Sequence, residues 1–127
     1  MNEDHLKIES YRDLIVWKKS IVLIKQIYFI TQTFPANEKF GLVSQMRRAC
    51  VSIPSNIAEG HARRTTADYV RFISMSEGSL AELDTQLIVS IELSFCTKDQ
   101  TKEIFLLMSE IRKMLNALRR TLLAKIN

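Results

Sequence analysis

Glycine and proline are scarce in this sequence, with three glycines and two prolines among 127 residues. β-Sandwiches and barrels depend on many tight turns, which these residue types usually supply, so the scarcity excludes such folds. Hydrophobic residues nevertheless make up 46% of the chain, and its length is that of one domain with its own core. The composition therefore predicts a single all-helical domain.

Cysteine is rare too, because Cys50 and Cys96 are the only two and lie far apart. Their spacing fits neither a disulfide framework nor a zinc site. Helix bundles that bind two metal ions repeat a Glu-x-x-His pattern, but the residue three positions after Glu59 is Ala62. We therefore expect reduced thiols, no metal and no cofactor.

Long uninterrupted apolar segments are also missing. The most apolar window, Leu14–Phe34, contains Lys18, Lys19 and Lys25, and each lysine would be costly in lipid. The first residues are polar and acidic, unlike a secretory segment. The sequence predicts a cytoplasmic protein without a membrane partner.

Apolar residues recur every three or four positions through most of the chain, which predicts amphipathic helices. Short links between them require neighbouring helices to run antiparallel. Thr65 or Thr66 is expected to cap the third helix, and Thr97 with Gln100 forms a capping box before the fourth. The prediction is an all-α, up-down-up-down four-helix bundle over residues 13–127 after a flexible tail at 1–12, with the first three helices near 13–33, 38–59 and 66–95.

The first helix has more apolar surface than one bundle normally uses. Two apolar lines run along it, and Ile15, Val22 and Phe29 add a third. An apolar surplus of this kind favours a partner, and the simplest partner is a second copy of the chain. We therefore expect a homo-oligomer.

The segment Ser52–Gly60 places a proline inside the apolar pattern of the second helix. Pro54 lacks an N–H for the carbonyl of Cys50, so a kink or an opened turn is expected there. The side chains of Ser52, Ser55 and Asn56 can supply local hydrogen bonds. Gly60 is expected to end the helix in a left-handed conformation.

This segment and a second block, Gly78–Leu83 with Thr85–Leu87, resemble the family of small four-helix proteins encoded in intervening sequences of bacterial 23S ribosomal RNA genes. Asp13-Leu14, Val16-Trp17 and Gln45–Ala49 belong to the same resemblance, which covers nearly everything from Asp13 to Leu123. The resemblance implies a ring of five subunits and no established catalytic activity. The family is also similar to the accessory proteins of diversity-generating retroelements, which are basic five-membered barrels that bind nucleic acid and cooperate with a reverse transcriptase.

Polar residues of these two blocks have two interpretations. Ser52, Ser55, Asn56, Glu59 and Glu82 are residue types found in active sites, and two carboxylates on adjacent helices can divide acid and base roles. However, no histidine is placed to activate a serine. We therefore expect a structural network rather than an enzyme, formed by Ser52, Pro54, Ser55, Asn56, Glu59, Gly60, Gly78, Ser79, Glu82 and Gln86.

Basic residues exceed acidic ones, giving a net charge of +4. One group is expected around the junction of the second and third helices and another along the fourth helix. Such groups can contact a phosphate backbone. Phe105 is the only aromatic residue interspersed in the second group, so base stacking is not supported. We predict binding of RNA or DNA, with a protein-interaction scaffold or an accessory subunit of a reverse transcriptase as the alternative; the expected nucleic-acid-binding residues are Arg47, Arg48, Arg63, Arg64, Arg71, Arg112, Lys113, Arg119 and Arg120.

Overall fold

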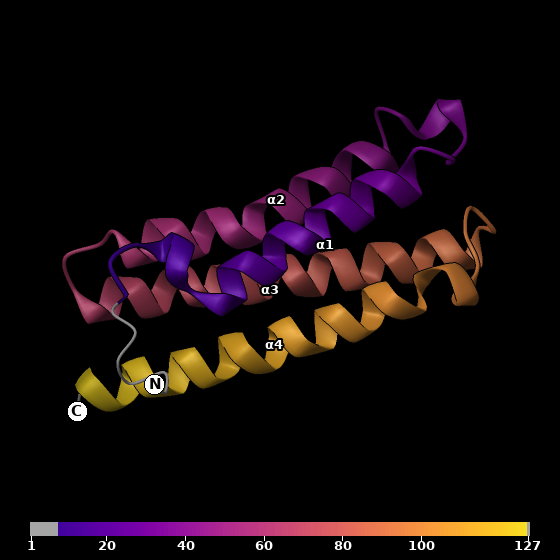
Figure 1. The fold of residues 1–127 in the computed structure, drawn as a ribbon. Coiled ribbons are helices and arrows are strands. Elements are labelled where there is room, and N and C mark those ends of the chain that lie inside the picture. Colours follow the sequence, from indigo (N-terminus) through magenta and orange to yellow (C-terminus); the bar gives the residue numbers. More distant parts are fainter. Residues whose placement is uncertain (1–7, 127) are drawn as a thin grey trace.

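The computed structural model describes residues 8–126, and every regular element in that range is helical. Four long helices run alternately up and down, as Figure 1 shows, so the predicted four-helix bundle is confirmed. None of them combines the length and apolar character needed to cross a membrane. The elements are the 3₁₀ helix η2 (Tyr11–Asp13), α1 (Ile15–Thr31), the 3₁₀ helix η3 (Ala36–Glu38), α2 (Leu42–His61), α3 (Thr66–Glu92) and α4 (Lys98–Ile126).

The start of the bundle differs in detail from the sequence prediction. Ser10 and Asp13 form a reciprocal capping box around η2, and Leu14 is extended, so α1 begins at Ile15 rather than at Asp13. The Tyr11 ring packs edge-on against Trp17, with 5.5 Å between ring centroids. Ordered structure thus begins inside the segment expected as a tail, whereas residues 1–7 lie outside the described residues.

The core lies along the axis of the bundle and receives side chains from all four long helices. Burying one such aliphatic side chain stabilises the fold by about 1.5–3 kcal/mol. The apolar line of α1 formed by Ile15, Val22 and Phe29 stays outside this core. The largest fully buried side chains are Leu23, Ile27, Met46, Ile53, Ile57, Ile73, Leu83, Leu87, Met108, Ile111 and Leu115.

Helix α2 continues through Pro54, as the apolar pattern predicts. The hydroxyl of Ser55 donates to the carbonyl of Val51 at 2.8 Å, and the amide of Asn56 donates to the carbonyl of Ser52 at 2.9 Å. Ser76 of α3 adds a bond of 2.7 Å to the carbonyl of Ile53. Side chains therefore support the backbone on both sides of the proline.

The predicted role of Gly60 is wrong. Gly60 lies inside α2, is buried, and has no positive φ, since α2 continues to His61. A Cβ at this position would lie 2.8 Å from Phe72 Cβ and 2.9 Å from Tyr69 Cδ1. Glycine is required because the start of α3 approaches the α2 backbone closely at this point.

The predicted caps of α3 and α4 are confirmed. Thr65 accepts from the N–H of Asp68, and Thr97 and Gln100 bond each other's backbone N–H.

Helix α3 ends at Glu92, earlier than the predicted Phe95. Ser94 takes the left-handed conformation with φ of 63°, and its N–H and that of Phe95 donate to the carbonyls of Ile91 and Ser90. These two bonds form a Schellman motif, which closes α3 with a serine in the place where glycine is more common.

Candidate nucleic-acid interface

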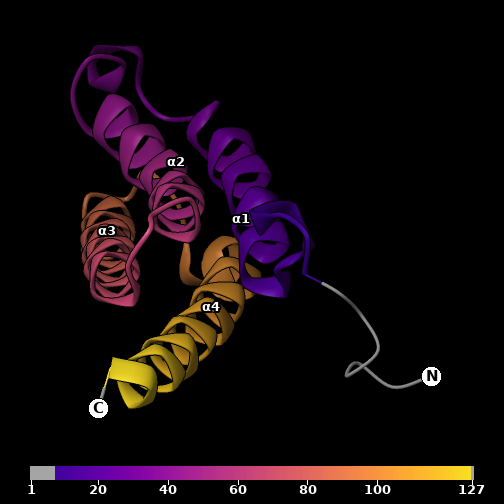
Figure 2. The same cartoon turned by 90° about the vertical axis from the view of Figure 1, so that its left-hand side faces the viewer.

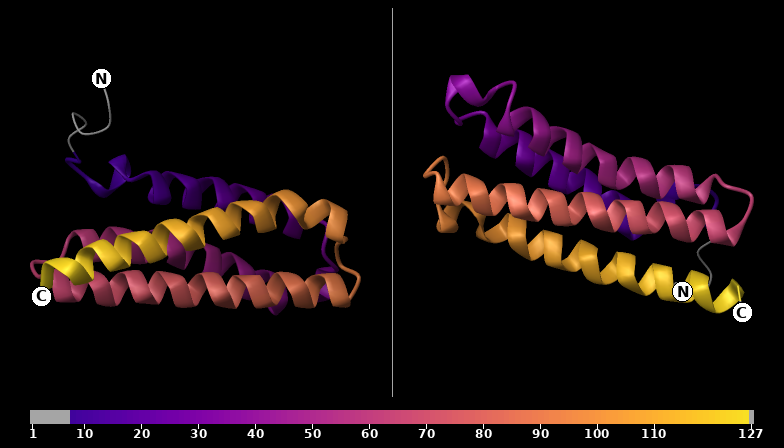
Figure 3. Two further views of the ribbon diagram at one scale, coloured as in Figure 1. Left: turned by 90° about the horizontal axis from the view of Figure 1, so that it is seen from below. Right: turned by 180° about the vertical axis from the view of Figure 1, so that it is seen from behind.

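Arginines from distant parts of the sequence meet at one end of the bundle. Arg63 and Arg64 lie between α2 and α3, Arg71 lies in the second turn of α3, and Arg119 and Arg120 lie near the end of α4. The antiparallel connections place these segments at the same end, as the views in Figure 1 and Figure 3 agree. We call these five residues the basic end; Lys125, in the last turn of α4, lies there too and was not singled out in the sequence.

Two arginines of the basic end share one aromatic ring. The Arg63 and Arg71 guanidinium groups lie 4.5 Å and 5.1 Å from the centroid of Phe72. Each also faces one carboxylate at 3.7 Å, Glu59 for Arg63 and Asp68 for Arg71. Both side chains stay substantially exposed, so these weak surface pairs leave them accessible.

Arg119 is held more firmly than its neighbour. Its Nε donates to Glu77 of α3 at 2.9 Å, and its Nη2 donates to Asn116 at 2.7 Å. Arg119 is therefore not free on the surface of α4, because it connects α4 to α3. Arg120 is exposed and makes no ion pair within residues 8–126.

Arg112 and Lys113 lie farther along α4 from the basic end, and both are exposed. Arg112 borders a shallow hollow together with Glu77 and Asp84 of α3. Nearby carboxylates lower the positive potential around Arg112, so it is a weaker anchor for phosphate than Arg120.

Arg47 and Arg48 do not join the basic end, contrary to the predicted cluster. About 21 Å of helix separates Arg47 from His61 at 1.5 Å per residue. Arg47 instead binds α1, because its Nε donates to Thr31 at 3.0 Å and its guanidinium lies 4.5 Å from the Tyr28 ring. Arg48 is exposed beside Tyr28 and Phe40. Sequence periodicity could not reveal these partners, because they come from the antiparallel neighbour.

The polar residues between α2 and α3 are bonded to one another. The hydroxyls of Ser52 and Ser79 are 2.9 Å apart, and Asn56 donates to Ser52 Oγ at 2.9 Å. Gln86 donates to Glu82 at 3.4 Å, a long bond. Gln86 Oε1 is buried without a partner within residues 8–126.

The two carboxylates considered for catalysis are not near each other. Ser52 and Ser79 mark a level where α2 and α3 touch, and Glu59 and Glu82 lie on opposite sides of that level. Ten residues of helix in total place them about 15 Å apart along the axis. They are too distant to act as acid and base on one bond.

Neither cysteine provides a reactive thiolate at neutral pH. Burial raises the pKa of the Cys50 thiol to about 11 and raises the pKa of Cys96. Within residues 8–126, no three His, Cys, Asp or Glu side chains gather as a metal site would require.

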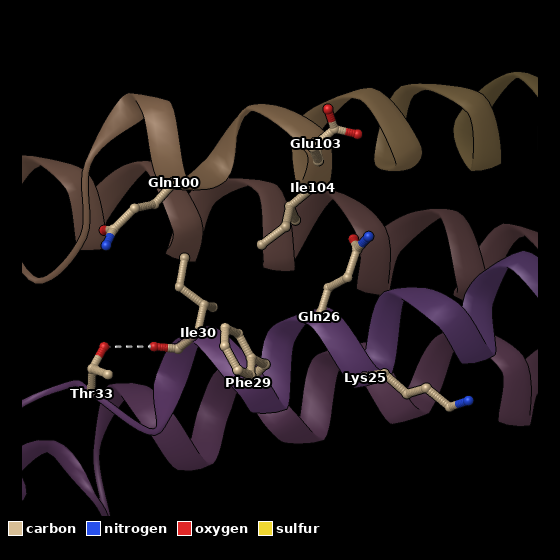
Figure 4. A pocket seen from close by; sticks show the side chains of 8 residues that line it. All are labelled: Lys25, Gln26, Phe29, Ile30, Thr33, Gln100, Glu103 and Ile104. Atoms are coloured by element: carbon tan, nitrogen blue, oxygen red, sulfur yellow. Dashed lines mark hydrogen bonds between the residues drawn. The ribbon is translucent and has the colours of Figure 1, made fainter.

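A hollow of about 420 Å³ lies between α1 and α4 (Figure 4). Phe29, Ile30 and Ile104 supply its apolar lining, and Lys25 and Glu103 lie on different helices around it. Gln26 also lines it, and the buried Oε1 of Gln26 has no partner among the described residues. Among the described residues, no serine, cysteine or histidine lines this hollow, and its surface is mainly that of an apolar groove.

Comparison with known proteins agrees with this helical architecture. The chain is similar to a crystal structure of a protein with unknown function from the S23 ribosomal protein family of Bacteroides thetaiotaomicron VPI-5482. The two share 25% sequence identity with a TM-score of 0.75 over 83% of this chain and 98% of the other. No curated protein matches the chain. The 23S rRNA-intervening sequence protein family matches residues 12–117, from η2 well into α4, and the chain belongs to this family.

Proposed function

We propose that this protein is a cytoplasmic, non-enzymatic homo-oligomer that binds RNA electrostatically through its basic end. The observation that carries the proposal is the meeting of arginines from the α2–α3 junction and from α4 at one end of the bundle. A net charge of +4 adds a favourable field for a polyanion. Membership of a family named for a ribosomal RNA intervening sequence makes RNA the first ligand to test.

Phosphate contacts explain how the basic end would work. Arg64 and Arg120 are exposed and make no ion pair within residues 8–126, so they can approach phosphates without first leaving a partner. The ring of Phe72 is buried beneath Arg63 and Arg71 and offers no free face for base stacking. Binding is therefore expected to depend on charge rather than on sequence, and several subunits would multiply the contacts.

The test is fluorescence anisotropy of a labelled RNA across a salt series. The variant Arg64→Gln/Arg120→Gln should bind RNA more weakly, and its affinity should depend less steeply on salt. Each lost phosphate contact should lower that slope by about 0.7–0.9. The matched control is Lys98→Gln/Lys102→Gln, which removes the same charge from exposed positions at the opposite end of α4.

Two outcomes would contradict RNA binding at this end. One is the absence of any affinity at low salt. The other is an equal loss of affinity in the two double variants, which would mean that only total charge matters.

A protein-interaction scaffold is the second candidate, and the exposed apolar line of α1 favours it. In this case, the oligomer would present surfaces to a polymerase, such as a reverse transcriptase, or to another protein. Capture of a defined partner protein that survives nuclease treatment would favour the scaffold. Light scattering of the purified protein would measure the subunit number, which the family resemblance suggests is five.

A further inference from the structure

The outer face of α1 is apolar and positively charged. Ile15, Val22 and Phe29 are 48%, 46% and 76% exposed and repeat every seven residues, the spacing at which helices pack along one another. Lys18 and Lys25 are exposed beside this line, at the same spacing of seven. From Ile15 to Thr31 the helix contains no acidic residue. A helix that covered this face would need small or apolar side chains and negative charge.

The outer face of α3 has those properties. Ser74, Gly78, Ala81 and Thr85 are all exposed and follow one another at spacings of four, three and four. Among the residues that the structure describes, nothing lies within 4 Å of a Cβ placed on Gly78, so this strip of small residues is open. Large side chains from another helix can therefore approach the backbone of α3 closely.

Charge and apolar side chains flank the strip of small residues. Met75 and Val89 are partly exposed beside it, and Glu82 and Glu92 are exposed. Between Phe72 and Cys96 the sequence has four acidic residues and no lysine or arginine. The outer face of α3 thus complements the outer face of α1 in charge, and its small side chains complement the large ones of α1.

The two faces point in different directions from the same molecule. Each of α1 and α3 packs on α2 and α4, and they do not pack on each other, so they occupy opposite corners of the bundle, as the end view in Figure 2 shows. Both helices run in the same direction along the bundle (Figure 1). One copy can therefore offer α1 to a second copy while its own α3 receives a third, with all copies parallel.

We propose that the outer face of α1 packs in parallel along the outer face of α3 of the next copy. In this contact Ile15, Val22 and Phe29 lie over the strip of small residues, and in that register Lys25 lies at the level of Glu82. The contact is head-to-tail, so its repetition builds a ring or a filament rather than a closed dimer. This inference rests on the homo-oligomeric part of the proposed function and names the surfaces that form it.

A steric test uses Gly78→Leu, with Ala117→Leu on the exposed side of α4 as the matched control. The open space at Gly78 means that leucine fits the isolated fold, so helical content should not fall. Light scattering should give a monomer mass for Gly78→Leu and the wild-type oligomer mass for Ala117→Leu. Assembly of both variants to the wild-type mass would overturn the contact.

A charge-swap test uses two variants, Lys25→Glu and Glu82→Lys. Each alone places like charges across the contact and should weaken assembly about tenfold or more. Combined in one chain, the two changes should restore assembly in a ring of any size, because every reversed α1 then meets a reversed α3. Failure of the combined variant to assemble, while each single variant is weakened, would contradict the pairing of these charges.

The wild-type protein separates this inference from the proposed function. A wild-type monomer across the micromolar range would overturn both homo-oligomerisation and the contact, and would point to another protein as the occupant of the α1 face. A wild-type oligomer that tolerates every variant would overturn the contact alone. RNA anisotropy on the monomeric Gly78→Leu variant would still report binding at the basic end.

Discussion

The two sides of the bundle are built differently. Between α2 and α3, the hydroxyls of Ser52 and Ser79 bond each other, and Ser76 of α3 bonds the backbone of α2 at Ile53. Between α1 and α4, the Lys19–Glu110 ion pair joins the helices, and the apolar hollow of Figure 4 lies farther along the same pair. One side is thus closed by side chains, whereas the other leaves an apolar hollow open. Each side has one buried glutamine oxygen without a partner among the described residues, that of Gln86 on α3 and that of Gln26 on α1.

This difference separates the positions that hold the fold from those that are available for association. Shortening a side chain in a closely packed helix pair costs much stability, because the surroundings cannot collapse fully into the cavity. The same change beside a hollow costs less stability, since solvent already reaches the space. Four predictions test this contrast, in descending order of expected effect.

Shortening buried isoleucines on the two sides should give the largest difference. Ile53→Ala, between α2 and α3, should cost about 4 kcal/mol, whereas Ile104→Ala, beside the hollow, should cost about 2 kcal/mol. Ile53 is fully buried and Ile104 lines the hollow, so the first change leaves a sealed cavity and the second enlarges an open one. Urea unfolding followed by circular dichroism measures both, and equal losses would contradict the contrast.

Alkaline pH should destabilise the protein through Cys50. Because the fold raises the pKa of this thiol from 9.0 to about 11, it favours the neutral form. The buried neutral thiol contributes about 3 kcal/mol to the free energy of unfolding. This contribution is fully present below pH 9 and is lost as the pH rises toward 11. The free energy of unfolding, measured from pH 8 to 11, should therefore fall less steeply for Cys50→Ala than for the wild type. An identical pH profile would mean that water reaches the thiol in the native protein.

Two glycines should respond in opposite directions to the same change. Gly60→Ala should cost about 2 kcal/mol, because the new methyl group meets Phe72 Cβ where α2 and α3 approach closely. Gly78→Ala should stabilise the fold by about 0.5–1 kcal/mol, since it lies in open helix. Thermal unfolding at a concentration where the protein is monomeric compares them directly. Destabilisation by both would contradict the open position of Gly78 in the single chain.

The smallest effect is expected at the hollow. Gln26→Leu should stabilise the protein by up to about 1 kcal/mol, because it removes a buried oxygen without a partner and extends the apolar lining. The matched change Gln32→Leu, at the exposed C-cap of the same helix, should have little effect. Equal effects from the two changes in chemical denaturation would show that the oxygen of Gln26 is solvated.

Much of the fold could be predicted because its signals are local. Apolar periodicity predicted four helices, and the caps at Thr65 and at Thr97–Gln100 need only neighbouring residues. The continuation of α2 through Pro54 followed from the same periodicity. These features depend on residues within a few positions of one another.

The predictions were wrong where contacts with residues distant in the sequence determine the local structure. Gly60 was expected to end a helix, but glycine is needed there because α3 approaches closely. The residues next to Gly60 in the sequence do not reveal this contact. Ser94, not a glycine, closes α3. Arg47 and Arg119 were expected to be free for nucleic acid, but Thr31 and Glu77 on neighbouring helices hold them. The sequence identified the basic residues, but only the fold shows which of them lie close together.

The bonds of Arg119 to Glu77 and Asn116 have a further consequence for the adjacent residue. They fix the last turns of α4 against α3, so the backbone that carries Arg120 is held in place before any ligand arrives. A group presented from a rigid support gives up less conformational entropy on binding than one on a frayed terminus. In the proposed RNA complex, Arg119 thus makes Arg120 more effective, and Arg119→Ala should shorten the lifetime of the complex more than it slows its formation.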